Sequence, residues 1–275
     1  SNVSCEALAK RDGRTGAKAG ASWRENLSFP VYGRLIIGAR LSKKMKILAI
    51  EQSTNICSVA LLEDTGVIGE KQWTQEQPRG HMLFNILPEF LNSLSAKLND
   101  INLFASGIGP GSFSGLRIAC TAVNSFALPG KTKVMGIPSV NALAYEIFNE
   151  TKAKIVTVLG DARRDHFWAA RFESIDQTTV KPSILLVPYK NLKSEITTDS
   201  VVVSPDFDRF SDMLNQASNE SSTRLITVTR VPKASAVGKL AFLCRDTDSP
   251  AHPIYLHPAA GRRAEEKSIN GKISC

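Results

Sequence analysis

The stretch Leu103–Leu128, LFASGIGPGSFSGLRIACTAVNSFAL, decides the fold class. Its first six residues are an apolar run of the length of a buried strand. A glycine-rich turn follows, and we predict a helix over Ser114–Leu128. A strand that passes through such a turn directly into a helix is the repeating unit of α/β proteins.

The residues before this stretch predict three consecutive strands and a helix. Met45–Asp64 reads as two apolar runs around a polar turn, which is typical of a β-hairpin. Val67–Thr74 is a third strand. His81–Leu98 has apolar side chains at helical spacing, with Pro88 expected to kink the helix.

The residues after it repeat the alternation and then begin a second unit. A strand at Lys133–Ile137 and a helix at Val140–Phe148 are followed by a second hairpin, Lys154–Glu173. Further strands are expected at Ile184–Val187, Val201–Ser204 and Leu225–Val228, with a helix at Ala234–Cys244. We therefore predict four segments: a disordered leader over residues 1–44, a first subdomain over 45–150, a smaller second subdomain over 151–262 and a flexible tail over 263–275.

The net charge of +8 does not by itself indicate a nucleic-acid-binding protein. Residues 1–44 contain nine basic and three acidic residues, so only two of the eight surplus charges belong to the rest of the chain. This leader is either a disordered extension, a targeting segment or the product of a start site placed upstream of Met45. Direct nucleic-acid binding by the chain is therefore weakly supported.

The remaining composition favours a cytoplasmic globular protein. With 43% hydrophobic residues in 275, the chain can bury a sizeable core, and it has no apolar run long enough to span a bilayer. Its five cysteines are scattered, which is typical of free thiols. Its four histidines, at positions 81, 166, 252 and 257, form no local pair, so we predict no metal site.

The run Gly109–Arg117, GPGSFSGLR, is the strongest candidate for chemistry. Ser114 is placed to cap the following helix, and free amides at a helix start can hold an anion. The same residues also fit a tight turn without a ligand, and the lysine of a phosphate-binding P-loop is absent. Because GxSxG is absent too and no serine has a recognisable base, we predict no catalytic residue.

GPGSFSGLR resembles the signature GPGSFTGLR of the TsaB/YeaZ family, with Ser114 replacing the threonine. MKILAI at the first strand, GIPS with its following AL at Gly136–Leu143, DARRDHFWA at Asp161–Ala169 and the terminal P-x-YL at Pro253–Leu256 are family-like and occur in the same order. The resemblance covers residues 45–258. It implies an α/β fold of the actin-like and sugar-kinase-like (ASKHA) type, built of two βββαβα-type subdomains.

The resemblance also implies a function. Members of this family are accessory subunits in the synthesis of N6-threonylcarbamoyladenosine at position 37 of tRNAs that read ANN codons. The implied partners are a catalytic TsaD-type subunit, a small TsaE-type P-loop ATPase and, for the chain alone, a second copy. The resemblance implies that ATP and magnesium are bound by the assembled complex and that this chain alone binds no cofactor. It also implies that the chain contacts tRNA only as part of the complex. No membrane is involved.

This chain departs from the family pattern at the end of the first strand. Relatives have Asp-Thr-Ser there, and this chain has Glu51-Gln52-Ser53. In superfamily members that turn over ATP, a carboxylate here helps to position magnesium and phosphate. The predicted nucleotide, anion or partner junction comprises Glu51, Ser53, Gly109, Gly111, Ser112, Ser114, Gly115 and Arg117.

The predicted helices His81–Leu98 and Ser114–Leu128 have more apolar or small residues than a single buried stripe needs. Both could be ordinary core helices, but the family pairs through them. The predicted partner-helix interface comprises Met82, Phe84, Ile86, Leu87, Leu116, Ala119, Ala122 and Val123.

Two enzymatic alternatives to a non-catalytic scaffold remain. A stand-alone ASKHA-type small-molecule kinase would need a second glycine-rich phosphate loop, which residues 154–245 do not contain. A metal-dependent peptidase-like enzyme would contain bound metal.

Overall fold

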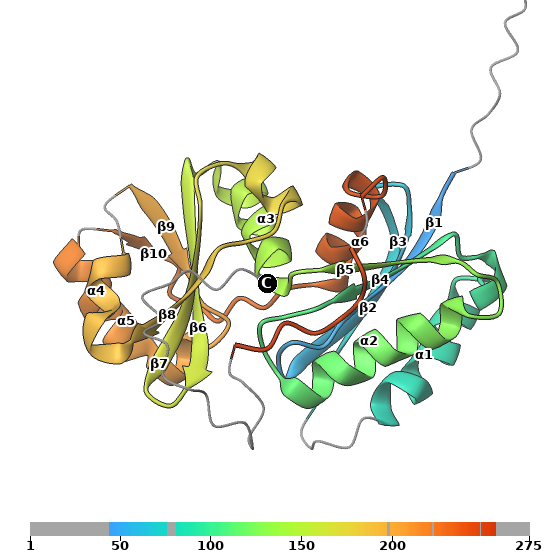
Figure 1. The fold of residues 1–275 in the computed structure, drawn as a ribbon, viewed down its shortest axis with the longest axis horizontal. Coiled ribbons are helices and arrows are strands. Elements are labelled where there is room, and N and C mark those ends of the chain that lie inside the picture. The colour runs from blue at the N-terminus through green and yellow to red at the C-terminus, as the bar shows by residue number, and fades with distance from the viewer. Residues whose placement is uncertain (1–43, 76–80, 197–198, 222, 248, 257–275) are drawn as a thin grey trace, which may run out of the picture. The chain divides into compact units, whose positions relative to one another are not determined.

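The computed structural model describes residues 44–75, 81–196, 199–221, 223–247 and 249–256. Apart from Lys44, the predicted leader lies outside the described residues, as does the tail over 263–275. The described residues form two five-stranded sheets with helices on their faces (Figure 1).

The first sheet has the strand order β3-β2-β1-β4-β5. Its first three strands, β1 (Lys46–Glu51), β2 (Ile56–Glu63) and β3 (Gly66–Thr74), form an antiparallel meander. β4 (Leu103–Gly107) and β5 (Lys133–Ile137) add parallel strands beside β1. The carboxyl ends of β1, β4 and β5 therefore lie at one edge of the sheet.

Helices cover both faces of this sheet because its strands are apolar on both sides. α1 (His81–Ser93) and α2 (Phe113–Ala127) contribute Leu83 and Val123 to a core with Leu48 and Ile50. The alternate residues of the same strands pack against α6 (Ala234–Leu243) on the opposite face. A 3-10 turn, η1 (Leu98–Asp100), precedes β4.

The second sheet has the order β10-β9-β6-β7-β8. β6 (Ile155–Arg163), β7 (His166–Phe172) and β8 (Ile184–Pro188) form the meander, and β9 (Ser200–Val203) and β10 (Arg224–Leu225) are parallel additions. α4 (Leu192–Glu195) and α5 (Phe207–Ser221) cover one face, with η2 (Ile175–Thr179) and η3 (Tyr189–Asn191) in the connections. Each sheet thus has the meander-first order predicted for an ASKHA-type fold, and the fold class is confirmed.

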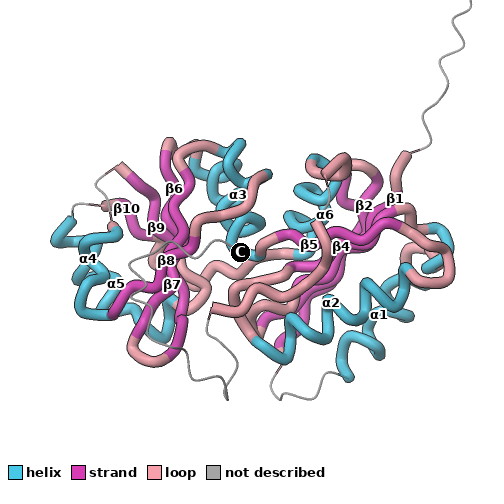
Figure 2. Tube along the Cα trace, viewed as in Figure 1, coloured by secondary structure: helices cyan, strands magenta, loops and turns pink. Residues whose placement is uncertain are grey.

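Two helices pack away from the strands they follow in the chain (Figure 2). α3 (Ser139–Thr151) follows β5 of the first sheet but packs against β6, where Val140 and Leu143 join Val156 and Val158. α6 follows β10 of the second sheet but packs against β1 and β2, and α3 and α6 touch each other. The subdomain ranges 45–150 and 151–262 stay a prediction.

Most predicted elements are present, with three differences. α1 ends at Ser93 rather than Leu98, because the chain turns there and Ser95 has a positive φ of 51°. The strand expected at Leu225–Val228 shrinks to two residues, and α5 was not predicted. In the part of the chain that the structure describes, no helix combines the length and apolarity needed to cross a membrane.

Candidate functional site

Three sequence motifs meet in a chain of buried hydrogen bonds at the carboxyl edge of the first sheet. Glu51, at the end of β1, accepts a hydrogen bond from the Ser53 amide (2.6 Å) and one from the Ser139 hydroxyl (2.8 Å). The Ser139 oxygen in turn accepts from the Gly109 amide (3.0 Å), and the Ser139 amide donates to the Gly109 carbonyl (2.7 Å). The end of β1, the glycine-rich turn and the start of α3 are therefore fastened together.

The Glu51 carboxylate is enclosed by protein. The residue is 0% exposed, and each of its carboxylate oxygens accepts a protein hydrogen bond. Burial raises the pKa of Glu51, although the hydrogen bonds from Ser53 and Ser139 oppose this shift. This geometry gives Glu51 a structural role at the position where nucleotide-using relatives of the fold are expected to bind magnesium.

The glycine-rich turn lies directly on the β1–β2 connection. The Ser112 amide donates to the Ser53 carbonyl at 2.7 Å. A Cβ atom on Gly115 would be only 2.1 Å from the Gln52 carbonyl oxygen, so no larger residue fits there without a shift. The glycine thus permits a close approach of α2 to this connection.

The N-cap of α2 lies two residues before the predicted one. Ser112, not Ser114, is the N-cap, and its hydroxyl accepts a hydrogen bond from the Gly115 amide at 3.3 Å. The helix begins one residue earlier than expected because Ser112 can reach back to this amide. Of the eight predicted junction residues, Gly111, Ser112, Ser114 and Arg117 are exposed, while Glu51, Ser53, Gly109 and Gly115 are buried.

An exposed aromatic pair joins this turn to the end of the described chain. Phe113 and Tyr255 are 56% and 48% exposed, yet their ring centroids lie 5.1 Å apart. The Arg117 guanidinium lies over the Phe113 ring, 5.2 Å from its centroid. A hollow of about 430 Å³ continues from Arg117 and Tyr255 along α2. Such exposed aromatic and arginine side chains are enriched at protein interfaces.

The predicted partner-helix interface splits into a buried and an exposed part. Five of its members are at most 4% exposed: Leu87, Leu116, Ala119, Ala122 and Val123. All of them except Leu116 belong to the apolar core beside the first sheet. Assigning these five to a partner surface was wrong. Their spacing reflects contact with this chain's own sheet.

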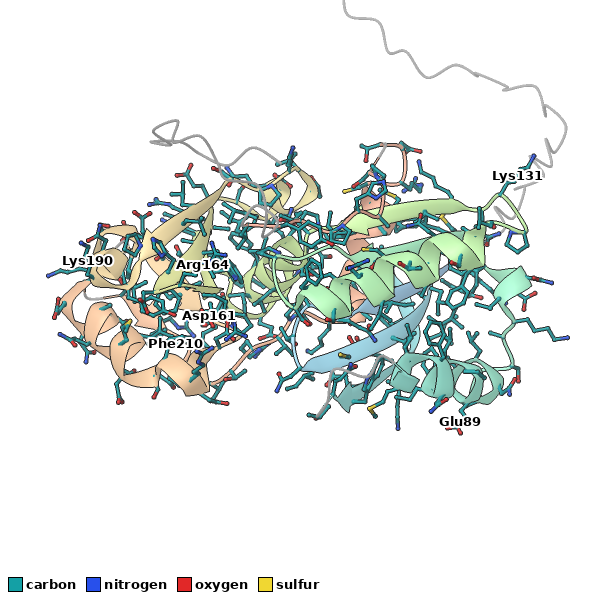
Figure 3. The ribbon with its side chains drawn as sticks, turned by 60° about the horizontal axis from the view of Figure 1, so that its bottom comes forward. Glu89, Lys131, Asp161, Arg164, Lys190 and Phe210 are labelled. Carbon is teal, nitrogen blue, oxygen red and sulfur yellow. The ribbon has the colours of Figure 1, made fainter. Side chains whose placement is uncertain are left out.

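The exposed part lies on α1. Met82 and Phe84 are 38% and 51% exposed, and Ile86 is half-buried. Glu89, further along the helix, points away from the sheet (Figure 3). Because residues two apart on a helix point to nearly opposite sides, Met82 and Phe84 flank the buried Leu83 of α1 on either side.

The second family motif, DARRDHFWA, forms the β6–β7 hairpin around Asp161 (Figure 3). The Asp161 side chain is 4% exposed, pairs with Arg163 and Arg209, and accepts from the Tyr189 hydroxyl at 3.2 Å. A second carboxylate, that of Asp206, accepts a hydrogen bond from the Asp161 amide. Burial raises the pKa of Asp206. These contacts hold the turn in place.

No group of three potential metal ligands occurs among the described residues. His166 contacts the Arg164 carbonyl through Nδ1 at 2.6 Å. The cysteines at positions 57, 120 and 244 are buried free thiols. Burial raises the pKa of Cys57 to about 12, so this thiol is not a reactive nucleophile at neutral pH.

Two contributors to the site were not singled out from the sequence. Ser139 lies in the GIPS motif, but nothing in that motif shows that its hydroxyl bridges Glu51 and Gly109. Tyr255 lies in the terminal P-x-YL motif, 142 positions from its ring partner Phe113, and spacing does not reveal such a contact.

Comparison with known families identifies similar proteins. The family model described as TsaD, tRNA N6-adenosine threonylcarbamoyltransferase, matches residues 81–248. The chain is 28% identical over 165 residues to the tRNA threonylcarbamoyladenosine biosynthesis protein TsaB of Escherichia coli, covering 56% of this chain and 70% of that protein. It is 32% identical over 129 residues to the protein of the same name from Haemophilus influenzae, covering 46% of this chain and 53% of that protein.

Solved structures from Pseudomonas aeruginosa show the same fold. A protein described as uncharacterized with similarity to peptidase YeaZ superposes with a TM-score of 0.64 at 22% identity. The superposition covers 78% of this chain and all of that one. YeaZ of the same organism gives a TM-score of 0.62 at 21% identity, over 77% of this chain and all of that one.

Proposed function

Because the chain belongs to the TsaD family and, within it, to the TsaB/YeaZ group indicated by its Gly109–Arg117 motif, we propose that it acts in tRNA threonylcarbamoyladenosine biosynthesis as a non-catalytic subunit. In this proposal it pairs with a catalytic TsaD-type subunit and keeps that subunit in a productive arrangement. The product is N6-threonylcarbamoyladenosine at position 37 of tRNAs that read ANN codons.

The observation that carries the non-catalytic role is the burial of Glu51. Both carboxylate oxygens accept hydrogen bonds from this chain's own residues, and the residue is 0% exposed. Magnesium would have to displace Ser53 and Ser139 and open the junction with the glycine-rich turn. The motif that marks the family thus serves to shape the protein, which supports a partner role over nucleotide turnover.

The exposed apolar face of α1 supports the choice of docking surface. α1 exposes large apolar side chains at Met82 (38%) and Phe84 (51%), one on each side of its buried stripe. Aromatic side chains such as Phe84 are enriched among the residues that dominate binding at protein interfaces. We place the catalytic subunit on this face, with the Phe113–Arg117–Tyr255 cluster at its border. The same face serves the homodimer when the catalytic subunit is absent.

The remaining members of the complex follow from the same proposal. A TsaE-type ATPase joins the pair and brings ATP and magnesium, and tRNA is bound by the complex in the cytoplasm. This chain supplies surface and no cofactor.

Co-purification with a TsaD-type subunit tests the docking surface. Phe84→Glu places a charge on the exposed face of α1 and is expected to weaken the complex at least about tenfold, because an interface anchor is replaced by an unpaired charge. The matched control is Val228→Glu, which changes a 54% exposed apolar residue of the second subdomain. Val228→Glu should bind as the native chain does, and circular dichroism should show both variants folded. Undiminished binding by Phe84→Glu would remove α1 from the interface.

A further inference from the structure

The second subdomain contains a cavity of about 500 Å³ that none of the family motifs explains, apart from Ala169 at the end of one of them. It lies between the face of β6, β7 and β8 and the helix α4, with walls from all four elements and from the connection after η2. This volume is within the range of small-molecule sites. The cavity is far in sequence from the Glu51 junction and shares no lining residue with it.

The cavity exists because the apolar core of this sheet face ends early. Along β7, Phe167 and Ala169 pack into the core with α5, and strand alternation places Arg171 next on the same face. Its cross-strand partner on β6 is Thr157. Two polar residues therefore stand where the pattern of the sheet would continue the core.

Thr157 is a buried polar residue of this cavity. The residue is 1% exposed, and its hydroxyl has no hydrogen-bond partner among the described residues. Leaving a buried hydroxyl unpaired is unfavourable for folding. Because Thr157 also lines the cavity, its hydroxyl is available to pair with a polar ligand.

The charges around the cavity select the class of ligand. Two cations, Arg171 and Lys181, and two carboxylates, Glu173 and Glu195, line it together. Arg171 and Glu173 form a loose pair at 3.6 Å, with side chains that are 40% and 64% exposed, so exchanging this pair for ligand contacts is inexpensive. The balanced charges disfavour polyanions such as nucleoside triphosphates and match a molecule that carries one charge of each sign.

We propose that this cavity binds a free α-amino acid. The ligand carboxylate takes the planar donor fork of Arg171, and the ammonium group lies between Glu173 and Glu195. The ligand side chain lies over Ala169 and Leu185, and a ligand donor pairs with the Thr157 hydroxyl. This inference does not depend on the proposed role in tRNA modification.

Calorimetric titration of the full-length protein with serine, threonine, valine and leucine, one at a time, tests the proposal. At least one of them is expected to bind saturably. Its N-acetyl derivative, which lacks the ammonium group, and its amide, which lacks the carboxylate, should each bind about tenfold more weakly or worse. Absence of saturable binding by all four amino acids overturns the proposal, as does equal binding of the two derivatives.

Variants locate the binding in this cavity. Arg171→Gln should weaken binding of the same amino acid about tenfold or more, since it removes the guanidinium charge. Thr157→Val keeps the shape of the side chain and should weaken binding while raising the thermal midpoint of the unliganded protein. Arg224→Gln is the matched control, because Arg224 lies on β10 and does not line the cavity. Equal loss in Arg224→Gln, or no loss in Arg171→Gln and Thr157→Val, would place the binding elsewhere.

Discussion

At the scale of single residues, Glu51 has a structural role at a position where a carboxylate can also bind metal. A carboxylate at the end of β1 suggested metal and nucleotide chemistry, but here it is buried and bound to Ser53 and Ser139. The neighbouring Gly107 makes this possible, because a Cβ atom at that position would be 1.8 Å from a Glu51 carboxylate oxygen. The Glu51 side chain therefore occupies space that only a glycine at position 107 leaves open.

The raised pKa of Glu51 predicts a specific pH dependence of stability. A carboxyl whose pKa is higher in the folded than in the unfolded state binds more protons when folded, so its contribution to stability is largest below about pH 4.5 and falls as pH rises through the folded pKa. Glu51→Gln removes this titration. The thermal midpoint of the variant minus that of the native protein should therefore become more positive between pH 4.5 and pH 8.

Thermal unfolding of both proteins across this range is the measurement. Ser53→Ala is a useful comparison, because the carboxyl continues to titrate in this variant and loses a side-chain interaction that lowers its pKa. The stability of this variant should therefore still fall as pH rises. A difference between native protein and Glu51→Gln that is constant with pH, or that falls as pH rises, contradicts the assignment.

At the scale of secondary-structure elements, α2 shows where periodicity informs and where it misleads. Small and apolar residues at Ala119, Ala122 and Val123 were correctly placed on one helix, but the partner surface assigned to them is this chain's own core. Periodicity reports that a stripe is covered and does not say by what. Met82 and Phe84 of α1 are as apolar as the buried Leu83 and Leu87, and only the fold shows which of them are covered.

A pair of adjacent substitutions on α2 tests this correction. Ala122→Asp buries an unpaired carboxylate against the first sheet and is expected to lower the free energy of unfolding by about 3 kcal/mol or more. Thr121→Asp makes the same change on the exposed side of the same turn and should alter it by about 0.5 kcal/mol or less. Urea denaturation followed by circular dichroism measures both. Similar stability of the two variants would mean that Ala122 is not a core residue.

The elements themselves were largely predictable because their signals are local. The meanders of both sheets and the helices α2 and α3 follow from apolar runs, turn residues and spacing. α5 was missed because its apolar positions, Phe207, Phe210, Leu214 and Ala217, are spaced for a helix but lie in an otherwise polar segment. The positions of α3 and α6 depend on contacts distant in sequence, which no local pattern encodes. The Ser139 bridge and the Phe113–Tyr255 pair were out of reach for the same reason.

At the scale of the whole molecule, the described residues that hold the fold together differ from those that are exposed and available for contacts. The family motifs of the first subdomain form the hydrogen bonds that join β1, the glycine-rich turn and α3. The motif DARRDHFWA contributes an ion pair that holds the β6–β7 hairpin. The features left for other molecules are the exposed face of α1, the aromatic cluster at Phe113 and the cavity beside Arg171. This division supports the proposed role as a partner subunit.

Reconstitution of the tRNA modification tests this account most directly. A TsaD-type subunit, a TsaE-type ATPase, tRNA, threonine, bicarbonate and ATP are combined with the native chain, with Phe84→Glu, with Glu51→Gln or with no added chain, and threonylcarbamoyladenosine is measured. The account predicts product with the native chain and with Glu51→Gln, and product reduced to the level without the chain for Phe84→Glu. Equal product in the absence of the chain would contradict its role in the reaction, and loss of product with a folded Glu51→Gln would contradict its role as a non-catalytic partner.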